Sequence, residues 1–575
     1  MDEVLKEVYH SITKRKSPAL PQLSVPEKGT KAQKQLVFLS VTDHRGKAYV
    51  TRGTHTSLSS AIEGAMLSFF KNMDSPHFQP QAVKLDIVAS VRPMKKEQPF
   101  IHIKKDKVGY KRGLDGIAFG EDLELAFLPE EVTAYQMIKD KKINPDNVLA
   151  AFGKHFLLTN QEKVKLLKSD KEIKAYKFQT QSFYTDGDEV KELFRGHPMY
   201  KSVTSEEVQE AIEWTNNYYF KEVVNQNGSF TYSYLPQENQ QEKRYNILRH
   251  AGTVYSMYET YEHTKDEQVY QEALRAMDYL LEQVRNHKIN GETVKVVVEK
   301  NAMKLGGNAL AIIALAKYTT LTKDTQYLSI MQDLAAWINE IQNEEGRFTI
   351  HKQKYRSGEV SDFVSHFYPG ESILALVRLY QIDKNEKWLD VAENAAHYLI
   401  NIRDKNENED SIAHDHWLLY GLNELYRERS KELYKDHSFL VAEAIMKTQF
   451  VDHADEPDWL GGYAVPRTPP ESTPVACRSE GLCAVYKLAK DYHHHELADR
   501  VKEAIRKGIG FQLQMQLRPE STLYYENKNL CWGAIQRSLN RFDLRIDYTQ
   551  HNISSFIAFY NILTRKDQEA AAFSE

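Results

Sequence analysis

The chain has 575 residues and a formal net charge of −5, and 41% of its residues are hydrophobic and 27% charged. This composition is typical of globular chains with a sizeable core, and the length predicts two to four domains at about 100 to 200 residues each. The slightly acidic balance excludes a basic field for a phosphate backbone, so nucleic acid is not an expected partner. Three cysteines are too few for a disulfide framework. Because the sequence has no signal-type N-terminus and no apolar run of about eighteen residues, we expect a cytoplasmic protein without a membrane span.

Residues 1–34 are expected to form a short helix followed by a linker. The stretch "MDEVLKEVYHSITKRK" predicts the helix. The stretch "SPALPQLSVPEKGTKAQK" is rich in proline, lysine and serine and has no apolar periodicity, which is typical of a linker.

Residues 35–195 show the pattern of an α+β domain, because short strands alternate with helices. "LVFLSVTD" and "KAYVTRG" flank the turn "DHRGK", which predicts a β-hairpin. "SLSSAIEGAMLSFFKNM" predicts an amphipathic helix with serine at its start, and "AVKLDIVASV" predicts a further strand.

One stretch of this domain resembles a known family. Residues 109–132, "GYKRGLDGIAFGEDLELAFLPEEV", resemble the small α/β domain family named after the AMME-syndrome candidate protein, in which a "GxxGI" turn and a "FLPEV"-like stretch recur. This sequence lacks the Arg-Gly-Cys-Ile-Gly element of that family. The resemblance therefore implies a fold for the region and no function.

Residues 200–570 are predicted to be helical throughout and to repeat one design. In six places a polar or glycine-bearing segment leads directly into an apolar helix, and successive copies lie roughly 60 residues apart. Amphipathic helices lie between them, and several of these end in a glycine-aromatic element, "NGSF", "EGRF" or "LGGY". The six segments are "RYNILRHAGTVYSMYETYEHT", "KLGGNALAIIALAKYTTLT", "SHFYPGESILALVRLYQIDK", "IAHDHWLLYGLNELYRERS", "ACRSEGLCAVYKLAKDYH" and "LRIDYTQHNISSFIAFYNIL".

Six helical hairpins can close into a ring with the apolar helices inside and the amphipathic helices outside. The predicted fold is therefore an α+β N-terminal domain followed by an all-α (α/α)6 toroid. In such a ring every inner helix presents the same end to the central cavity. We expect the polar segments to converge at one mouth, where a ligand would meet the fold.

The glycine-aromatic loops, the "YPGE" segment and the "GNALAIIALAKY" helix resemble the (α/α)6 superfamily of glycan-processing enzymes. Relatives in that superfamily include N-acylglucosamine 2-epimerases, unsaturated uronyl hydrolases and glucuronyl C5-epimerases. The resemblance covers roughly residues 200–570 and lies in the repeat pattern. It implies a toroid fold and a saccharide substrate, and it does not select one reaction.

Three carboxylates at the starts of inner helices are the candidate acid and base. Asp415 lies between two histidines in "HDHW", an arrangement that suits proton transfer near neutral pH. Glu371 in "YPGES" and Glu480 in "CRSEG" occupy matching positions in the third and fifth units, which favours a shared pocket. The alternative is structural, because Asp415 could be an N-cap and first-turn acids complement the helix dipole.

Two histidines complete the predicted catalytic set. His366 precedes the "YPGE" segment, and His551 lies in "RIDYTQHN". Asp547 precedes His551 by four residues, so on a helix the two share a face and could form a hydrogen-bonded pair. Asp547 could equally be an N-cap.

The remaining candidates would bind the substrate. Arg249, Arg478 and Arg545 are expected to hold a substrate carboxylate, although Arg478 could instead pair with Glu480. Aromatic residues beside the polar segments would pack on the apolar faces of sugar rings, although toroids also use aromatic side chains to fill their cores. The other predicted contacts are Tyr245, Asn246, His250, Tyr368, His414, His416, Trp417, Trp532 and Asp547.

We predict an enzyme that hydrolyses or epimerises a glycan or a uronic-acid-containing saccharide by carboxylate and histidine chemistry, without a cofactor. One alternative is a non-catalytic toroid that binds a glycan or a protein partner in a polymer-biosynthesis assembly. A second alternative is a zinc enzyme, because "CWGA" at Cys531 resembles a motif of lantibiotic cyclases, which are toroids that hold zinc with two cysteines and a histidine. The zinc ligands would then be Cys531, either Cys477 or Cys483, and His551. The sequence lacks the Cys-His pair of those cyclases, and Cys483 falls on an apolar helix face, where a core position is expected.

Overall fold

The computed structural model describes residues 1–16, 20, 34–73, 75–95, 98–120, 123, 125–154, 165, 167–169, 171–200, 202–452, 456–464 and 468–572. Most of the linker expected before residue 35 lies outside the described residues. In the described part of the chain, no helix has the length and apolar character needed to cross a membrane.

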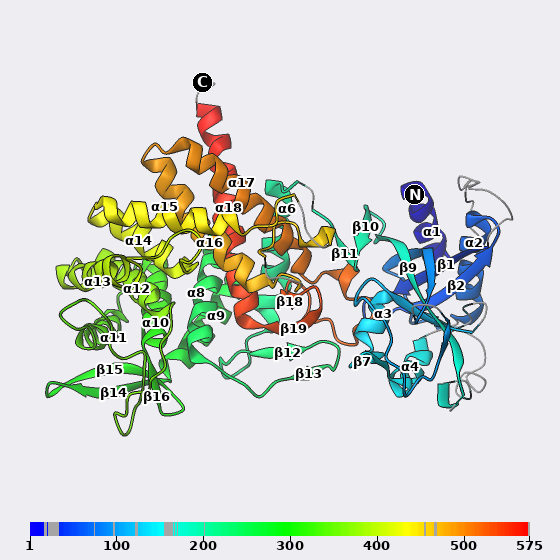
Figure 1. Ribbon diagram of the computed structural model, residues 1–575, viewed down its shortest axis with the longest axis horizontal. Coiled ribbons are helices and arrows are strands. Elements are labelled where there is room, and N and C mark those ends of the chain that lie inside the picture. The colour runs from blue at the N-terminus through cyan, green and yellow to red at the C-terminus, as the bar shows by residue number, and fades with distance from the viewer. Residues whose placement is uncertain are drawn as a thin grey trace.

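The N-terminal part of the chain folds around one antiparallel sheet, which Figure 1 shows on the right. The predicted hairpin is confirmed as β1 (Gln35–Thr42) and β2 (Tyr49–His55), and the predicted strand is confirmed as β3 (Ala82–Pro93). The main path of the sheet runs β11 (His197–Pro198), β10 (Val190–Phe194), β9 (Ile173–Thr185), β3, β1 and β2. Strands β4 (Phe100–Ile101), β5 (Gly116–Phe119) and β6 (Leu125–Phe127) pair off this path.

Two helices cover one face of this sheet, α1 (Asp2–Lys14) and α2 (Leu58–Asn72), the helix predicted from its serine start. Alternate residues of a strand point to opposite faces, so Val37 and Leu39 of β1 pack with the two helices in one apolar cluster. Phe38 points the other way and belongs to a larger cluster that continues into the helical body. The sheet is therefore buried on both faces at β1.

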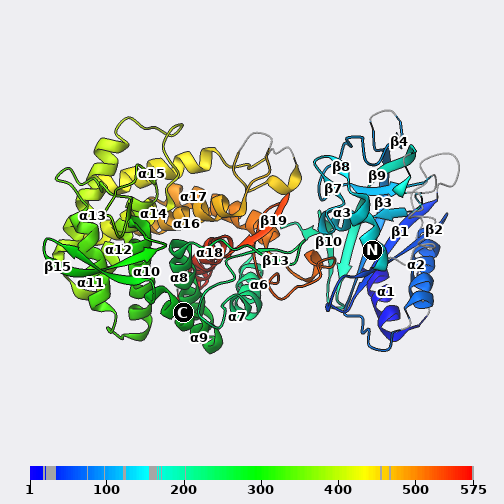
Figure 2. The ribbon, with the colours of Figure 1, turned by 90° about the horizontal axis from the view of Figure 1, so that it is seen from below.

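The helical body contains the six predicted inner helices, and they close into a ring. Each packs against the next, and the last packs against the first, which is the predicted (α/α)6 arrangement. Figure 1 and Figure 2 show this body beside the sheet. The inner helices are α8 (Ile247–Thr264), α10 (Leu305–Thr322), α12 (Tyr368–Asp383), α14 (His416–Glu428), α16 (Ser472–Asp491) and α18 (Ile546–Ala572).

Six outer helices surround the inner ring, and each packs against at least one inner helix. The outer helices are α6 (Ser205–Trp214), α9 (Glu267–Leu281), α11 (Leu328–Glu340), α13 (Glu386–Tyr398), α15 (Glu432–Lys447) and α17 (His495–Met515). The buried residues of α6, α9, α11, α13 and α15 lie on one side of each helix, so the opposite side is left for solvent. The helix α17 differs, because every residue from Gly508 to Met515 is buried.

The glycine-aromatic elements form the same loop at the end of each of several outer helices. Gly346, after α11, has a φ of 88°, and a Cβ placed on it would lie 2.1 Å from the carbonyl oxygen of Asn394 on α13. Gly461, after α15, has a φ of 82°, and its Cβ would lie 1.9 Å from the carbonyl oxygen of Lys507 on α17. Only glycine fits this backbone conformation at this distance, so the loop sets the spacing between neighbouring outer helices.

The prediction that residues 200–570 contain only helices is wrong, because two small sheets interrupt them. The stretch "ETVKVVVE" is rich in β-branched residues, which favour strands, and it forms β15. One sheet orders β14 (Val284–Ile289), β15 (Glu292–Glu299), β16 (Ala302–Lys304) and β17 (Lys352–Lys354). The other orders β13 (Gln240–Gln241), β12 (Ser233–Leu235), β19 (Arg541–Arg545) and β18 (Gln536–Ser538).

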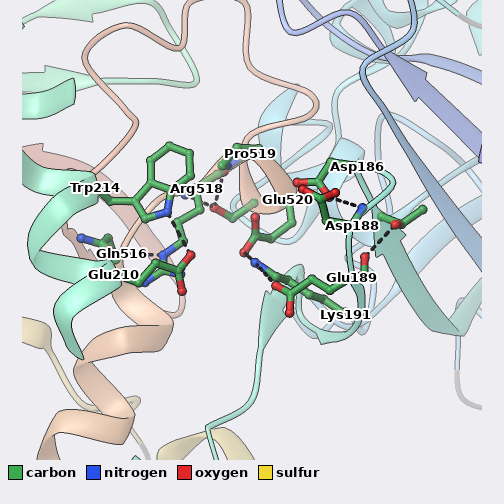
Figure 3. Close-up of polar contacts among 12 residues, drawn as sticks. Asp186, Asp188, Glu189, Lys191, Glu210, Trp214, Gln516, Arg518, Pro519 and Glu520 are labelled. Carbon is green, nitrogen blue, oxygen red and sulfur yellow. Dashed lines mark hydrogen bonds and ion pairs between the residues drawn. The ribbon is translucent and has the colours of Figure 1, made fainter. Parts of the chain in front are cut away.

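The two parts of the chain meet at the loop that follows α17. Lys191 of β10 pairs with Glu189, two residues earlier, at 2.9 Å, and with Glu520 of this loop at 3.7 Å. Figure 3 shows the three side chains together. Arg518, two residues before Glu520, pairs with Glu210 of α6 at 2.9 Å. These contacts join the sheet to the first and last hairpins of the ring.

Candidate functional site

The ring encloses a cavity of about 930 Å³ at the N-terminal ends of its inner helices, which is within the size range of ligand pockets. Residues from all six inner helices, α8, α10, α12, α14, α16 and α18, line it. Twelve of the predicted site residues lie on its wall. They are Asn246, Arg249, His366, Tyr368, Glu371, His414, His416, Trp417, Arg478, Arg545, Asp547 and His551.

Tyr245 and His250, two of the predicted substrate contacts, do not line the cavity. His250 is fully buried, its Nδ1 lies 2.7 Å from the Tyr245 hydroxyl, and its Nε2 lies 2.8 Å from the carbonyl oxygen of Ala276 on α9. Adjacent helical residues point about 100° apart. Arg249 therefore reaches the cavity while His250 packs outward against α9.

Trp532, another predicted substrate contact, also does not line the cavity. Its indole Nε1 donates a hydrogen bond to Thr522 at 2.9 Å, and its ring contacts Trp214 and Tyr218 beside α6. Gly533, the next residue, has a φ of 77°, and a Cβ on it would lie 2.2 Å from the carbonyl oxygen of Trp214. "CWGA" is therefore one more copy of the glycine loop, and its place between the last outer and inner helices could have revealed this.

The three cysteines separate in the structure. Cys531 is fully buried, and its thiol donates a hydrogen bond to the carbonyl oxygen of Asn527 at 3.4 Å. Cys483 is buried in the apolar core, as expected. Only Cys477 lies on the cavity wall near His551, so the zinc set built on Cys531 or Cys483 is wrong.

Glu371 combines burial with an unused oxygen atom. It is 2% exposed, and its Oε2 has no hydrogen-bond partner among the described residues. Gly306 of α10 leaves room for this carboxyl group, because a Cβ there would lie 2.2 Å from Oε2. Burial, helped by the nearby charge of Asp415, raises the pKa of Glu371 to about 8. The side chain therefore carries a proton at neutral pH.

Asp415 is the N-cap of α14, as the structural alternative predicted, but only one of its two carboxylate oxygens caps the helix. Its Oδ1 accepts a hydrogen bond from the backbone N–H of Leu418 at 3.1 Å, while Oδ2 has no partner in the described part of the chain. Asp415 is 1% exposed and does not line the cavity. Burial raises its pKa to about 7. It lies behind the wall, where its charge acts on Glu371.

Asp547 and His551 do not form the predicted pair. Asp547 accepts hydrogen bonds from Arg545 at 2.5 and 2.8 Å and from Arg249 at 2.9 Å. Burial alone would raise the pKa of Asp547, but the two arginines outweigh it and hold the pKa below its ordinary value. Two cations share one carboxylate here, so the group keeps a net positive charge.

His551 instead belongs to a cluster of four side chains, His416, Cys477, Glu480 and His551. Glu480 is 1% exposed, and its Oε2 lies 2.7 Å from His551 Nδ1 and 3.9 Å from His416 Nε2. One donor atom from each of the four lies within 4.8 Å of the others. The helix α16 begins at Ser472, earlier than the polar segment, so Cys477 and Glu480 lie one helical turn apart on one face.

Arg478 does not pair with Glu480. It differs from Arg249 and Arg545, the other predicted cavity arginines, because both of these pair with Asp547. Its Nε donates to His414 Nδ1 at 2.9 Å, and its Nη1 donates to the carbonyl oxygen of Pro474 at 3.0 Å. Its guanidinium also lies over the Tyr463 ring, 4.7 Å from the centroid. No carboxylate pairs with it among the described residues. A partly buried positive charge at the cavity wall is therefore available to a ligand.

Sequence reasoning missed the apolar lip of the cavity. Phe363, Val364 and Phe367 line it and are 46%, 62% and 46% exposed. The signal was present in "SDFVSHFYPGE", where three apolar side chains stand in a polar segment before a helix. Exposed apolar residues grouped in one place indicate a contact surface.

A scan against protein-family models finds no match, and a search of curated proteins finds none either. The structure is similar to a D-mannose isomerase at 14% identity and a TM-score of 0.46, over 63% of this chain and 98% of that one. It is similar to cellobiose 2-epimerase from Bacillus thermoamylovorans B4167 at 14% identity and a TM-score of 0.47, over 62% and 100% of the two chains. For an unsaturated glucuronyl hydrolase specific for heparin the identity is 12% and the TM-score 0.43, over 63% and 97%. The fold assignment rests on the closed ring of helix contacts, and the AMME-type resemblance stays a prediction.

Proposed function

We propose that the protein is an enzyme that processes an anionic, uronic-acid-type saccharide in the toroid cavity by proton transfer. The observation that carries this proposal is Arg478, whose guanidinium faces the cavity with no carboxylate partner in the described part of the chain. An arginine in such a position suits the planar carboxylate of a uronic acid, which can accept two parallel hydrogen bonds.

The rest of the wall supports a sugar as the occupant. Trp417, Tyr368 and Tyr548 line the cavity beside Asn246, His366 and the Arg249–Asp547–Arg545 group. Aromatic faces pack on the apolar C–H faces of a sugar ring, while charged and amide groups bind its hydroxyls. A cavity of about 930 Å³ has room for a short oligosaccharide.

Glu371 is the proposed proton donor. Its protonated form is favoured up to about pH 8, and Oε2 has no partner in the described structure. A carboxylic acid that keeps its proton near neutral pH is the group that donates to a leaving oxygen or to a carbonyl. We propose that the cluster of His416, Cys477, Glu480 and His551 supplies the second group of the acid–base pair, because His551 is near enough for its charge to act on Glu371. Hydrolysis and epimerisation both need an acid and a base.

The first test measures binding. We expect oligosaccharides that contain uronic acids to raise the melting temperature, and matched neutral oligosaccharides to raise it less. Arg478→Gln should abolish this difference, whereas Arg427→Gln should not, because Arg427 lies on the far part of α14 and pairs with Asp491. If the uronic-acid oligosaccharides stabilise Arg478→Gln as much as they stabilise the unchanged protein, Arg478 does not bind the carboxylate.

The second test measures chemistry. Glu371→Gln keeps the shape of the side chain but removes the acid, so we expect the variant to bind the best ligand with unchanged affinity and to lose turnover by about 100-fold or more. Product formation is followed by mass spectrometry or by solvent deuterium incorporation. If the unchanged protein binds the ligand without forming product or exchanging a proton, the toroid is a binding module.

A further inference from the structure

Three neighbouring inner helices bring metal-type donors together at the cavity, where His416, Cys477 and His551 are part of the wall and Glu480 is not. His416 is the first residue of α14, Cys477 and Glu480 lie one turn apart on α16, and His551 lies in the second turn of α18. These helices pack against each other in the ring. One ligand-type atom from each of the four side chains lies within 4.8 Å of all the others.

The spacing of these atoms fits a small tetrahedral ion. Zinc binds sulfur at about 2.3 Å and nitrogen or oxygen at about 2.0 to 2.2 Å, which puts neighbouring ligand atoms roughly 3.3 to 3.8 Å apart. The distances from Glu480 Oε2 to His551 and to His416, 2.7 and 3.9 Å, lie on either side of this range. Side-chain rotations that lengthen the shorter and shorten the longer of these distances would bring the donor atoms to tetrahedral spacing.

His416 gives an independent indication of a missing partner. Its ring is 4% exposed, and neither Nδ1 nor Nε2 has a hydrogen-bond partner among the described residues. Buried imidazole nitrogens in proteins are nearly always hydrogen-bonded or bound to a metal. Nε2 is the nitrogen that faces Glu480, and hence the centre of the cluster.

We infer that His416, Cys477, Glu480 and His551 bind one zinc-type divalent ion. Two imidazoles, a thiolate and a carboxylate form a donor set that zinc accepts, whereas magnesium and calcium prefer oxygen ligands only. Among the described residues, no arginine or lysine forms an ion pair with any of the four side chains that would compete with the ion. The bound ion would tie α14, α16 and α18 together beside the proposed sugar site.

This inference deepens the proposed function, and only its consequence for catalysis rests on that function. When the ion is bound, the imidazoles are ligands, and the second group of the acid–base pair is the metal site. Because the four side chains would fill the tetrahedron, the ion could polarise a carbonyl or hydroxyl oxygen of the substrate only by taking it as a fifth ligand. Glu371 itself is not in the cluster, so it can be changed without removing a ligand.

The test uses the full-length protein, stripped with a chelator and titrated with zinc or cobalt(II). We expect one ion per chain by elemental analysis, and with cobalt(II) a thiolate-to-metal charge-transfer band together with the visible bands of a tetrahedral site. Cys477→Ser should abolish the charge-transfer band and weaken zinc binding at least tenfold. Cys483→Ala is the matched control, because this cysteine lies in the apolar core and should leave both properties unchanged.

A second readout does not depend on spectroscopy. Zinc should slow the alkylation of Cys477 by iodoacetamide in the unchanged protein, and His416→Ala should remove this protection. The inference is overturned if the protein takes up no stoichiometric metal, or if the charge-transfer band survives in Cys477→Ser. Loss of metal in Cys477→Ser with normal metal in Glu371→Gln separates this site from the proton donor. A metal-loaded protein that binds uronates without turnover would overturn the proposed function and leave the metal site intact.

Discussion

At the scale of single residues, burial decides which groups can act as acids. Glu371 and Asp415 both start inner helices, but only Glu371 reaches the cavity, while Asp415 is held behind the wall by its capping hydrogen bond. The sequence favours Asp415 because of its two flanking histidines. The structure favours Glu371, because the empty space at Gly306 lets its carboxyl group stay unpaired among the described residues.

The activity should depend on the proton of Glu371. Since its folded-state pKa lies at about 8, the acid form is present below that pH and is lost as the pH rises through it. We expect kcat to fall about tenfold per pH unit above this value and the fall to disappear in Glu371→Gln, which retains only residual activity. A pH–rate profile of the two proteins checks this. If the rate falls with the same apparent pKa in the unchanged protein and in Glu371→Gln, a group other than Glu371 causes the fall.

The same group should also affect stability. In the unfolded chain Glu371 releases its proton near its ordinary pKa of 4.5, whereas in the folded protein it holds the proton up to about 8. The folded state therefore binds more protons between these values, and its stability falls as the pH rises through that window. Relative to the unchanged protein, Glu371→Gln should gain on the order of 4 kcal/mol from the acid to the alkaline end of the window. Urea unfolding at both ends measures this difference.

Gly346 provides a residue-scale test of the loop that spaces the outer helices. Gly346→Ala forces a Cβ to within 2.1 Å of the Asn394 carbonyl oxygen, so the free energy of unfolding should fall by about 3 kcal/mol or more. Gly291→Ala is the matched control, because Gly291 has a φ of 89°, close to the 88° of Gly346, but has no atom within 4 Å of its Cβ position. The control should lose about 1 kcal/mol, the backbone strain alone. If both variants lose the same stability, the backbone around Gly346 and α13 moves apart at little cost, and the close contact does not require glycine.

At the scale of helices, the start of α14 shows how one residue can carry two roles. Asp415 caps the helix with Oδ1 and leaves Oδ2 unpaired in the described structure. Asparagine caps helices as well as aspartate does, whereas alanine cannot cap. The two substitutions therefore separate the capping role from the effect of the charge.

We expect Asp415→Asn to keep the stability of the unchanged protein within about 1 kcal/mol, and Asp415→Ala to lose about 1 to 2 kcal/mol. Because the negative charge of Asp415 raises the pKa of Glu371, the alkaline limit of activity should move to lower pH in both variants. Chemical denaturation and the pH–rate profile measure the two effects. Complete loss of turnover in Asp415→Asn would instead make Asp415 a direct participant.

At the scale of the whole molecule, the two parts of the chain share one core. A single apolar cluster includes Phe38 and Phe178 of the sheet together with Ile312 and Phe556 of the inner ring. Tyr524, from the loop after α17, hydrogen-bonds Ser40 of β1 at 2.8 Å. Domains that share their buried surface unfold together.

Calorimetry should therefore show one cooperative transition for the whole chain. Arg195→Ala removes the partner of Asp458, which lies 2.6 Å from the Arg195 Nε and is 1% exposed, so it should destabilise the protein by about 3 kcal/mol and move the entire transition. Arg500→Ala, which breaks an exposed pair with Glu443, should change stability by less than about 1 kcal/mol. Two separate transitions, with only one of them moved by Arg195→Ala, would show that the parts unfold independently.

Much of the architecture could be predicted because local patterns determine it. The six inner helices, the first hairpin of the sheet and the glycine loops follow from apolar periodicity, from turn residues and from the need for glycine at positive φ. The strand β15 was missed, although its β-branched residues are a local signal. The copy of the loop at Gly533 was missed because the two residues before it, Cys531 and Trp532, resemble a metal-binding motif.

Apolar periodicity is enough to predict repeated helical hairpins whose polar ends meet at one mouth, because a ring with equivalent inner helices puts equivalent residues together. Which side chains share that mouth depends on tertiary packing. His250 packs outward, Asp547 pairs with arginines, and Cys477 joins His551, and each outcome depends on rotations of a helix by one residue. The apolar pattern of a helix does not define its rotation about its axis to better than one residue, which is about 100°. The packing of neighbouring helices fixes this rotation.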